Sequence, residues 1–531
     1  MTSRRCLLLL CTALLALLPA CNLPSIAETS DTDAIPCSPA ALITALAEAQ
    51  AQASSEITLA AGCVYQITQP YETHPQWMAT GLPAIRTQVT IHGDGATLLR
   101  APLSSTSTSA YRFFYIESGG SLTLDNLRLE NGGWAGELQA CTDPQGTCSV
   151  GGAMLLMGGE VNLQDVELVG NAARLGGAIS VGVANLNISG SLFEGNLAFA
   201  AGAIDTGTHS ETTISTSTFR GNQASVHESR GTAGAVDNSG SMTIQACLFD
   251  SNLATDYGGA LINTGYLDIS DSAIVHNWAN EGGAIVNDAG RTSLLNSTIS
   301  GNMSQRYVTS FQIGAVYVTY GYVDVVYSTI AENIGQGTGI SGLGDTNIHL
   351  ENAIIANNSG GDCYFIRPIL TASGVLDSDG SCPDAMLTAD PRLGPLADNG
   401  GGTLTHALAF LSPAVDAGSG DDCPGSDQRG IARPYNGVCD LGAFEYREAE
   451  MGGVPPIIPN DLVIIEPEQP AVPDISVPPG IMDSACLQGL ELDLETHITL
   501  PAGTVVKVLG ITPNGAYIVL YDPCDTDIAP R

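Results

Sequence analysis

Lysine is almost absent from this chain of 531 residues, because Lys507 is the only lysine among 18 basic residues. A P-loop needs a lysine directly after its glycine-rich loop, and a pyridoxal phosphate enzyme needs one for its Schiff base, so both enzyme classes have only Lys507 to use. The 55 acidic residues give a formal net charge of −37, which repels the phosphate backbones that proteins bind through Lys and Arg. We therefore expect no nucleic acid partner.

Aromatic and charged residues are also scarce, at 5% and 14% of the chain, whereas glycine occurs 61 times. Glycine weakens helices, and the apolar residues are rich in Val, Ile and Leu beside many Thr, Asn and Ser, which favours strands and turns. Disorder is excluded because 44% of the residues are hydrophobic, enough to bury a core. The composition predicts an elongated or all-β protein.

Residues 1–20 have the pattern of an export signal. Two arginines precede an apolar run over residues 7–18, which is too short to span a membrane. The run ends in LPAC, which resembles the lipobox of bacterial lipoproteins, and this resemblance implies that Cys21 becomes a lipidated N-terminus. The alternative is ordinary secretion with cleavage near residues 25–27. We expect an exported protein, either anchored to a membrane at the cell surface or secreted.

The cysteines of the mature chain are consistent with export. Ten of them fall into pairs that are close in sequence, and no CxxC motif or ligand-spaced histidine accompanies them. In an exported protein such pairs are more typical of disulfides than of metal ligands. The expected pairs are Cys37 with Cys63, Cys141 with Cys148, Cys363 with Cys382, Cys423 with Cys439, and Cys486 with Cys524.

A repeat of about 25 residues dominates the chain. Each copy combines a Gly-Gly-Ala-aliphatic step with an apolar residue three positions before an asparagine, and two copies have alanine in place of the first glycine. Insertions at 225–232 and 304–312 lengthen two copies. The asparagines are Asn171, Asn196, Asn222, Asn252, Asn277, Asn302, Asn333 and Asn358.

Aligning the copies on this asparagine reveals the strands. Apolar residues stand eight positions before it in every copy and ten positions before it in most, and a period of two predicts a strand with one inward face. Five positions before it stands a small residue, which is Cys247 in one copy, so we expect a tight inward corner and a buried free thiol there.

One copy is too short to bury its own apolar face, so the copies must stack through their strand edges as a parallel β-helix. We expect the glycine pairs at corners where φ is positive or the backbones approach closely, and the asparagines in the left-handed conformation with stacked amides. Leucine-rich and propeller repeats are excluded because their LxxLxL and Trp-Asp signatures are missing.

The repeat and its flanks resemble known families. The GGA[I/L] and FxxN motifs resemble the repeats of the chlamydial polymorphic outer membrane proteins, surface adhesins and autotransporters whose passengers are right-handed β-helices. Residues 37–68 resemble the N-terminal cap of exported bacterial β-helix proteins, with one helix from Pro39 to about Gln52. Residues 390–446, with SPAVDAG, DQRGIARP and CDLGAFEY, resemble the C-terminal part of choice-of-anchor Q proteins. These resemblances imply surface display and bring no family-wide catalytic residue.

We therefore predict an all-β protein, a right-handed parallel β-helix with a capping helix and a small C-terminal β module. A Pro-rich spacer separates the module, whose two apolar runs around a Pro-Asn-Gly turn predict a hairpin. The expected segments are a signal peptide (1–20), a linker (21–36), a cap with the first coils (37–120), the β-helix repeats (121–389), a choice-of-anchor Q-like segment (390–446), a Pro-rich linker (447–482) and an SH3-like module (483–531).

Enzyme activity is weighed because parallel β-helices include pectin lyases and polygalacturonases, which place carboxylates on one outward strand face for Ca²⁺ binding or acid–base chemistry. The residue two past each GGA alanine is expected to point outward, and this column holds Asp205 and Asp237 on adjoining coils. His209 and the inserted residues 227–230 are near them in sequence. The alternative is a pair of solvated aspartates beside a polar column of asparagines, Asn238, Asn263 and Asn287.

Two weaker patterns are present. A tyrosine-rich stretch over residues 307–327 has the aromatic faces that stack on sugars, although packing under an insertion is the alternative. Asp421, Asp422 and Asp427 are candidate calcium ligands, with solvated loop carboxylates as the alternative. No other cofactor is expected.

The sequence thus favours a bacterial cell-surface β-helix protein that binds a polysaccharide or another cell-surface partner without catalysis. The competing hypothesis is an enzyme that degrades polysaccharide, as a lyase or a glycoside hydrolase, through Asp205 and Asp237.

Overall fold

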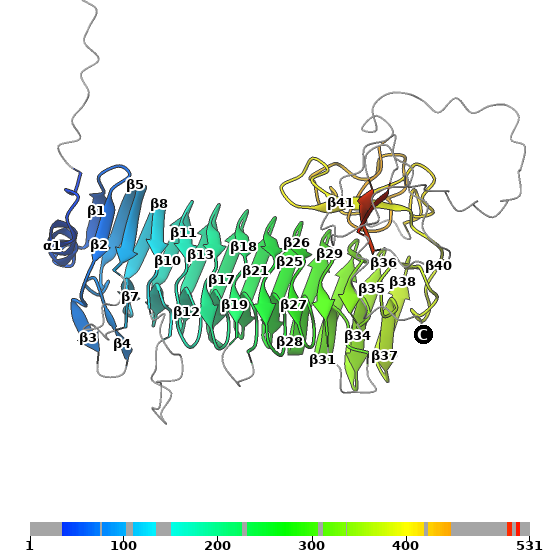
Figure 1. Cartoon of the computed structure of the whole chain (residues 1–531), viewed down its shortest axis with the longest axis horizontal. Coiled ribbons are helices and arrows are strands. Elements are labelled where there is room, and N and C mark those ends of the chain that lie inside the picture. Colours follow the sequence, from blue (N-terminus) through cyan, green and yellow to red (C-terminus); the bar gives the residue numbers. More distant parts are fainter. Residues whose placement is uncertain are drawn as a thin grey trace, which may run out of the picture. The chain divides into compact units, whose positions relative to one another are not determined.

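A computed structural model describes residues 34–74, 77–101, 110–133, 150–225, 231–305, 312–335, 337–418, 423–447, 507–511 and 517–520. The chain forms two units, Met1–Gly453 and Val454–Arg531, which are considered separately. In the first unit, strands from successive repeats stack side by side (Figure 1). Among the residues described, no helix has the length and apolar character to span a bilayer.

Each coil contributes one strand to each of three faces, and strands of one face pair in parallel with a register of one repeat. The first face consists of β7 (Phe114–Ile116), β9 (Met154–Leu156), β12 (Ile179–Val181), β16 (Ile204–Thr206), β20 (Val236–Asn238), β24 (Leu261–Asn263), β34 (Ile340–Leu343), β37 (Cys363–Ile366) and the starts of β28 (Ile285–Leu295) and β31 (Val316–Val326).

The second and third faces follow along each coil. The second face consists of β1 (Ser54–Thr58), β10 (Glu160–Gln164), β13 (Asn185–Ser189), β17 (Glu211–Ser215), β21 (Ser241–Gln245), β25 (Tyr266–Ser270), β35 (Thr346–Glu351), β38 (Ile369–Ser373), the first halves of β5 (Gln88–Arg100) and β8 (Ser121–Glu130), and the second halves of β28 and β31. The third face consists of β2 (Val64–Ile67), β11 (Glu167–Val169), β14 (Leu192–Glu194), β18 (Thr218–Arg220), β22 (Leu248–Asp250), β26 (Ala273–Val275), β29 (Thr298–Ser300), β32 (Thr329–Ala331), β36 (Ile354–Ala356), β39 (Leu376–Asp377), β40 (Leu387–Thr388) and the second halves of β5 and β8.

Two smaller sheets complete the coils. A parallel strip of two-residue strands follows the third face, and a three-stranded sheet lies among the first coils. The strip consists of β15 (Leu197–Ala198), β19 (Gln223–Ala224), β23 (Leu253–Ala254), β27 (Trp278–Ala279), β30 (Met303–Ser304) and β33 (Ile334–Gly335). The small sheet consists of β3 (Glu72–His74), β4 (Trp77–Thr80) and β6 (Tyr111–Arg112).

The fold is a right-handed parallel β-helix, as predicted, and its core follows the sequence columns. The residue eight positions before each repeat asparagine is at most 2% exposed in every coil from Leu163 to Leu350. Phe193, Phe219 and Phe249 stack on one another with ring centroids 4.6 Å apart. Burying a side chain of this size stabilises the folded chain by about 1.5–3 kcal/mol, so every coil adds to one continuous core.

The glycine pair marks a corner at which successive coils nearly touch. The first residue of the pair has a positive φ, between 57° and 65°, also where it is Ala201 or Ala233. A Cβ on the second glycine would strike the next coil, since at Gly177 it would lie 2.1 Å from the carbonyl oxygen of Gly202. The second position is glycine in all six of these copies, which this close contact between coils requires.

The repeat asparagines form a buried ladder, and the prediction of a left-handed conformation for them is wrong. In each coil the residue before the asparagine has the positive φ, from Gly170 to Asn357. The asparagine amide is then free to point inward, where each Nδ2 donates to the Oδ1 of the next coil over 2.9–3.0 Å. The ladder ends where Asn358 Nδ2 donates to Oδ1 of Asp362 at 2.9 Å.

The first coil is capped by α1 (Pro39–Ala49), which ends three residues earlier than expected and buries Leu42 and Leu46 completely. Disulfides join Cys37 to Cys63, Cys363 to Cys382 and Cys423 to Cys439, whereas both other expected pairs lie outside the described residues. Cys247 is a buried free thiol, as predicted, and the backbone N–H of Ser217 donates to its sulfur at 3.5 Å.

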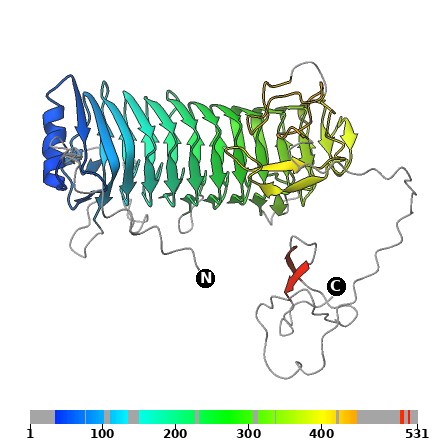
Figure 2. The same ribbon diagram turned by 90° about the horizontal axis from the view of Figure 1, so that it is seen from above.

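Residues 390–447 form a C-terminal lobe on the third face of the last coils (Figures 1 and 2), with 419–422 outside the described residues. Its strands β41 (Leu393–Ala397) and β42 (Thr405–Leu408) pair antiparallel. Thr298 Oγ1 donates to Oε1 of Gln428 at 2.6 Å, and Ser300 Oγ lies 2.8 Å from Nε2 of His406. These contacts fix the lobe to β29.

In the second unit, β43 (Lys507–Ile511) and β44 (Tyr517–Leu520) pair antiparallel. The expected signal peptide (1–20), Cys21 and the expected Pro-rich linker beyond Arg447 lie outside the described residues.

Candidate functional site

Asp205 and Asp237 are direct neighbours on the first face. They are the middle residues of β16 and β20, which pair in register, so their backbones are about one strand spacing of 4.8 Å apart. The flanking residues point into the core: Ile204 and Val236 are completely buried. Alternation along a strand therefore directs both carboxyl groups outward, as the sequence predicts.

The outward column is not solvated, which corrects one of the two alternatives drawn from the sequence. Its other members are nearly buried, and Leu155, Val286 and Tyr317 are 1%, 3% and 7% exposed. The reason is the GGA corner, which folds against the column: a Cβ on Gly282 would lie 2.3 Å from Cγ2 of Val286. Most of the column is thus covered, and Asp205 and Asp237 are its members that keep part of their surface exposed.

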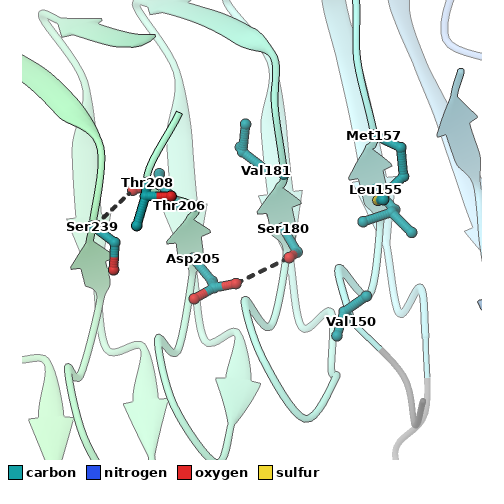
Figure 3. A pocket seen from close by; sticks show the side chains of 11 residues that line it. Val150, Leu155, Met157, Ser180, Val181, Asp205, Thr206, Thr208 and Ser239 are labelled. Atoms are coloured by element: carbon teal, nitrogen blue, oxygen red, sulfur yellow. Dashed lines mark hydrogen bonds between the residues drawn. The ribbon is translucent and has the colours of Figure 1, made fainter. Parts of the chain in front are cut away.

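Around Asp205 the first face has a groove, a hollow of about 490 Å³ (Figure 3). Its lining combines apolar side chains with hydroxyl groups and one carboxyl group, and it contains no basic side chain. Asp237 lies on the adjoining coil, outside this lining. The lining residues are Val150, Leu155, Met157, Ser180, Val181, Gly182, Asp205, Thr206, Gly207, Thr208 and Ser239.

Asp205 is held by the preceding coil. Ser180 Oγ, on β12, donates to Oδ2 of Asp205 at 3.0 Å, as Figure 3 shows. The next residue, Thr206, turns inward and donates to Oδ1 of Asn238 at 2.9 Å. One side of β16 is therefore tied to the core, and the other side presents an oriented carboxyl group to the hollow.

Both carboxyl groups hold their protons more tightly than a solvated aspartate does. Burial raises the pKa of Asp205, and the hydrogen bond from Ser180 opposes this shift. Burial also raises the pKa of Asp237 to about 7, and the negative charges of Asp205 and Asp288 contribute. Neighbouring carboxylates disfavour double ionisation, so the pair keeps a proton to higher pH than isolated aspartates do.

The expected polar column beside the pair lies inside the coil. Asn238, Asn263 and Asn287 are completely buried because each is the third residue of its stretch of the first face and points inward. Asn238 Nδ2 donates to Oδ1 of Asn263 at 2.8 Å, and Asn263 Nδ2 to Oδ1 of Asn287 at 3.1 Å. This second ladder supports the strands behind the carboxyl pair and does not line the hollow.

The structure separates the other residues predicted from the sequence. His209 is exposed and does not line the hollow, whereas 227–230 lie outside the described residues. Within the tyrosine-rich stretch, Tyr317 and Tyr327 are buried, Tyr320 and Tyr322 are exposed, and Tyr307 and Phe311 lie outside the described residues.

Of the calcium candidates, the structure describes Asp427, which is not a solvated loop carboxylate. Asp427 is completely buried, and its carboxylate accepts from the Arg429 guanidinium and from the backbone N–H groups of Ile431 and Glu445. Asp421 and Asp422 lie outside the described residues. Asp427 is therefore part of the core of the lobe.

One acidic cluster was missed by the sequence reasoning. Carboxylate oxygens of Asp362, Asp377 and Asp379 lie within 4.8 Å of one another at the last coil. Each already accepts protein donors: Asp362 from Asn358 and Ser378, Asp377 from the Cys382 N–H, and Asp379 from the Ser381 N–H. Because protein donors already bind these carboxylates, the cluster is explained by its structural role, which is to end the asparagine ladder. The D-x-D spacing after the last repeat asparagine is its only sequence signal.

No protein-family model matches this sequence, and no curated protein matches it. A crystal structure of the pectate lyase Pel9A aligns with a TM-score of 0.38 and 14% sequence identity, covering 76% of this chain and 90% of that chain. The fold assignment above rests on the strand pairing. Kinship with polymorphic outer membrane protein repeats and choice-of-anchor Q proteins stays a prediction.

Proposed function

We propose that this protein is an exported surface β-helix that binds a neutral polysaccharide in the groove of the first face, without catalysis. The observation that carries the proposal is the hollow at Asp205, where an oriented carboxyl group lies among apolar side chains and hydroxyl groups. Sugar rings offer both apolar C–H faces and hydroxyl groups, and binding pockets combine apolar walls with a few placed polar groups in the same way.

The charge of the site favours a neutral polymer over an acidic one. Asp205, Asp237 and Asp288 lie close enough for their charges to interact, and the whole chain has a net charge of −37. A uronate or sulfate group would meet like charge in the groove, with no basic side chain in the lining of the hollow to balance it. A neutral sugar instead finds the carboxyl group of Asp205 and the hydroxyl groups of the lining as hydrogen-bond partners.

The groove also has the form that a polymer needs. Its lining comes from successive coils, with Leu155 on β9, Ser180 on β12 and Asp205 on β16 in register, so it runs across neighbouring strands of the first face. The disulfides are consistent with an oxidising compartment, and export with lipidation at Cys21 remains part of the proposal.

A second candidate function is hydrolysis or elimination of a polysaccharide by the carboxyl pair. The raised pKa values of Asp205 and Asp237 favour it, because a general acid must hold its proton near the working pH. Glycosidases use two carboxyl groups in acid and base or nucleophile roles. New reducing ends or unsaturated products would favour this candidate.

The test is a glycan array followed by titration with any neutral oligosaccharide that binds. Asp205→Ala is expected to weaken binding about tenfold, and Ser180→Ala less, because the serine only orients the carboxyl group. Glu56→Ala is the control, since Glu56 is an exposed carboxyl group on β1, distant in sequence from Asp205. Binding of acidic glycans alone, or an undiminished affinity in Asp205→Ala, would contradict the proposal.

A further inference from the structure

The second face carries a row of large exposed side chains that the groove does not use. Tyr266, Arg291 and Tyr322 occupy the same outward position on β25, β28 and β31, which are adjacent strands in register. Tyr266 is 67% exposed and Tyr322 is 54% exposed. Tyr320, at the corner between the first and second faces, is 59% exposed.

Packing of the fold does not account for these rings. Tyr317 and Tyr327, from the same stretch of sequence, are buried and do contribute to packing. The outward position of the row is polar in preceding coils, where Glu211 and Ser241 occupy it. Isolated exposed aromatic residues are ordinary, but several within three consecutive coils form a platform that marks a binding surface.

The charge within the row is balanced. The Arg291 guanidinium lies 3.0 Å from Oδ2 of Asp324, which occupies the next outward position on β31. His349, on β35, lies 3.7 Å from the other oxygen of Asp324. The row thus offers hydrogen-bond donors and acceptors between two rings without a surplus of positive charge, which suits hydroxyl groups better than carboxylates or sulfates.

The spacing of the rings suits an extended polymer. Adjacent strands are about 4.8 Å apart, so Tyr266 and Tyr322, two strands apart, are separated by about 10 Å along the stack of coils. This is close to the length of two pyranose units in an extended 1,4-linked chain. Such a chain presents an equivalent ring face at every second sugar, in step with the two tyrosines.

We propose that the row of Tyr266, Arg291 and Tyr322 is a second binding site, which holds an extended neutral polysaccharide parallel to the stack of coils. Each tyrosine stacks on a sugar ring, and the Arg291–Asp324 pair bonds the hydroxyl groups between them. The inference extends the proposed function to a second face and stands on different residues, so either site can fail without the other.

The test uses the full chain and titration calorimetry with cellohexaose and chitohexaose, with polygalacturonate as the anionic comparison. Tyr266→Ala and Tyr322→Ala are each expected to weaken hexaose binding about fivefold, and the double variant more strongly, because each removes one stacking contact. Tyr266→Phe keeps the ring and is expected to keep most of the affinity. Tyr71→Ala is the control, since Tyr71 is 47% exposed and far away in the sequence.

The outcomes separate the two sites. If the tyrosine variants lose hexaose binding and Asp205→Ala binds normally, this inference is supported and binding in the groove is contradicted. If Asp205→Ala loses binding and the tyrosine variants bind normally, binding in the groove is supported and this inference is contradicted. The inference is overturned if the wild-type protein binds neither hexaose, or if the tyrosine variants bind as tightly as the wild type. It is also overturned if these variants lose only self-association in sedimentation experiments, which would assign the row to a second copy of the chain.

Discussion

The β-helix coils and the C-terminal lobe bury polar side chains in different ways. In the coils, the asparagine ladder repeats one neutral hydrogen-bond pattern, so each amide depends on identical neighbours. In the lobe, Asp427 pairs with Arg429 at 2.8 Å, and Arg433 lies 3.6 Å from Glu445, all with almost no exposed surface. A substitution in the ladder leaves the same bonds in place in the other coils, whereas loss of the Arg429 side chain removes the cation bonded to Asp427 and leaves that carboxylate with backbone N–H donors.

The largest loss of stability is expected from a substitution in the lobe. Arg429→Ala leaves Asp427 as a buried charge without its guanidinium partner and removes the cation over the Phe444 ring, 3.5 Å away. Removing one partner of a buried ion pair costs about 3–5 kcal/mol of unfolding free energy. Thermal unfolding, monitored by limited proteolysis of the lobe, measures this loss of stability. Arg392→Ala, at an exposed site of the same lobe, is the control, and equal melting of both variants would refute the role of the pair.

A smaller effect is expected from the ladder. Asn252→Ala removes the acceptor for the backbone N–H and Nδ2 of Asn222, at 3.0 and 2.9 Å, and the donor to Phe219 O. Buried groups without partners cost about 1–3 kcal/mol each, and neighbouring coils relax, so we expect about 2–3 kcal/mol in denaturant unfolding. Asn185→Ala, exposed on β13, is the control. A loss as large as that of Arg429→Ala would erase the distinction between the two regions.

Within a coil, the contribution of the outward carboxyl pair to stability is expected to depend on pH, whereas the contribution of the inward amides is not. Asp237 has a folded pKa of about 7 and an ordinary value of 3.8, so the folded chain binds more protons between these values. Its contribution to stability is present below pH 3.8 and is lost as the pH rises to about 7. Asp237→Asn should therefore stabilise the chain by about 1–3 kcal/mol at pH 8, allowing for partial exposure, and hardly at pH 4.

Unfolding experiments at both pH values check this prediction, with Asp268→Asn as the exposed control on the second face. An equal effect of Asp237→Asn at pH 4 and pH 8 would show that the carboxyl group titrates as a solvated one.

The smallest effect is expected at Cys247, whose column is serine in the neighbouring coils. Cys247→Ser should change stability by less than about 1 kcal/mol, because a hydroxyl can accept from the Ser217 N–H as the sulfur does. Burial raises the pKa of the thiol to about 12, so iodoacetamide should not label it before unfolding. Rapid labelling of the native protein would contradict its placement in the core.

The sequence predicts the coils well because one arrangement recurs often enough to align. The apolar columns and the buried thiol at Cys247 follow directly from the period of two within strands. The prediction for the backbone of the repeat asparagines was wrong. Turn propensity favours the left-handed region, but the ladder holds these amides inward. Local propensity was overridden by the contact between coils.

The candidate site was predicted only in part. Alternation along the strand placed Asp205 and Asp237 side by side, but their burial depends on how the GGA corner folds over the column, which no single repeat shows. Tyr266 was missed because it lies outside the tyrosine-rich stretch and meets Tyr322 only through the register of three coils. The ion pairs of the lobe follow no period, so sequence alone does not pair them.

Binding without catalysis is the central claim, and prolonged incubation of the wild-type protein with a neutral polysaccharide that it binds tests it most directly. Reducing ends and unsaturated products are measured at pH 6 and pH 8, on either side of the pKa of about 7 at Asp237. The predicted result is saturable binding with an unchanged polymer at both pH values. Product formation that disappears in Asp205→Asn and in Asp237→Asn would contradict the claim and identify the carboxyl pair as catalytic.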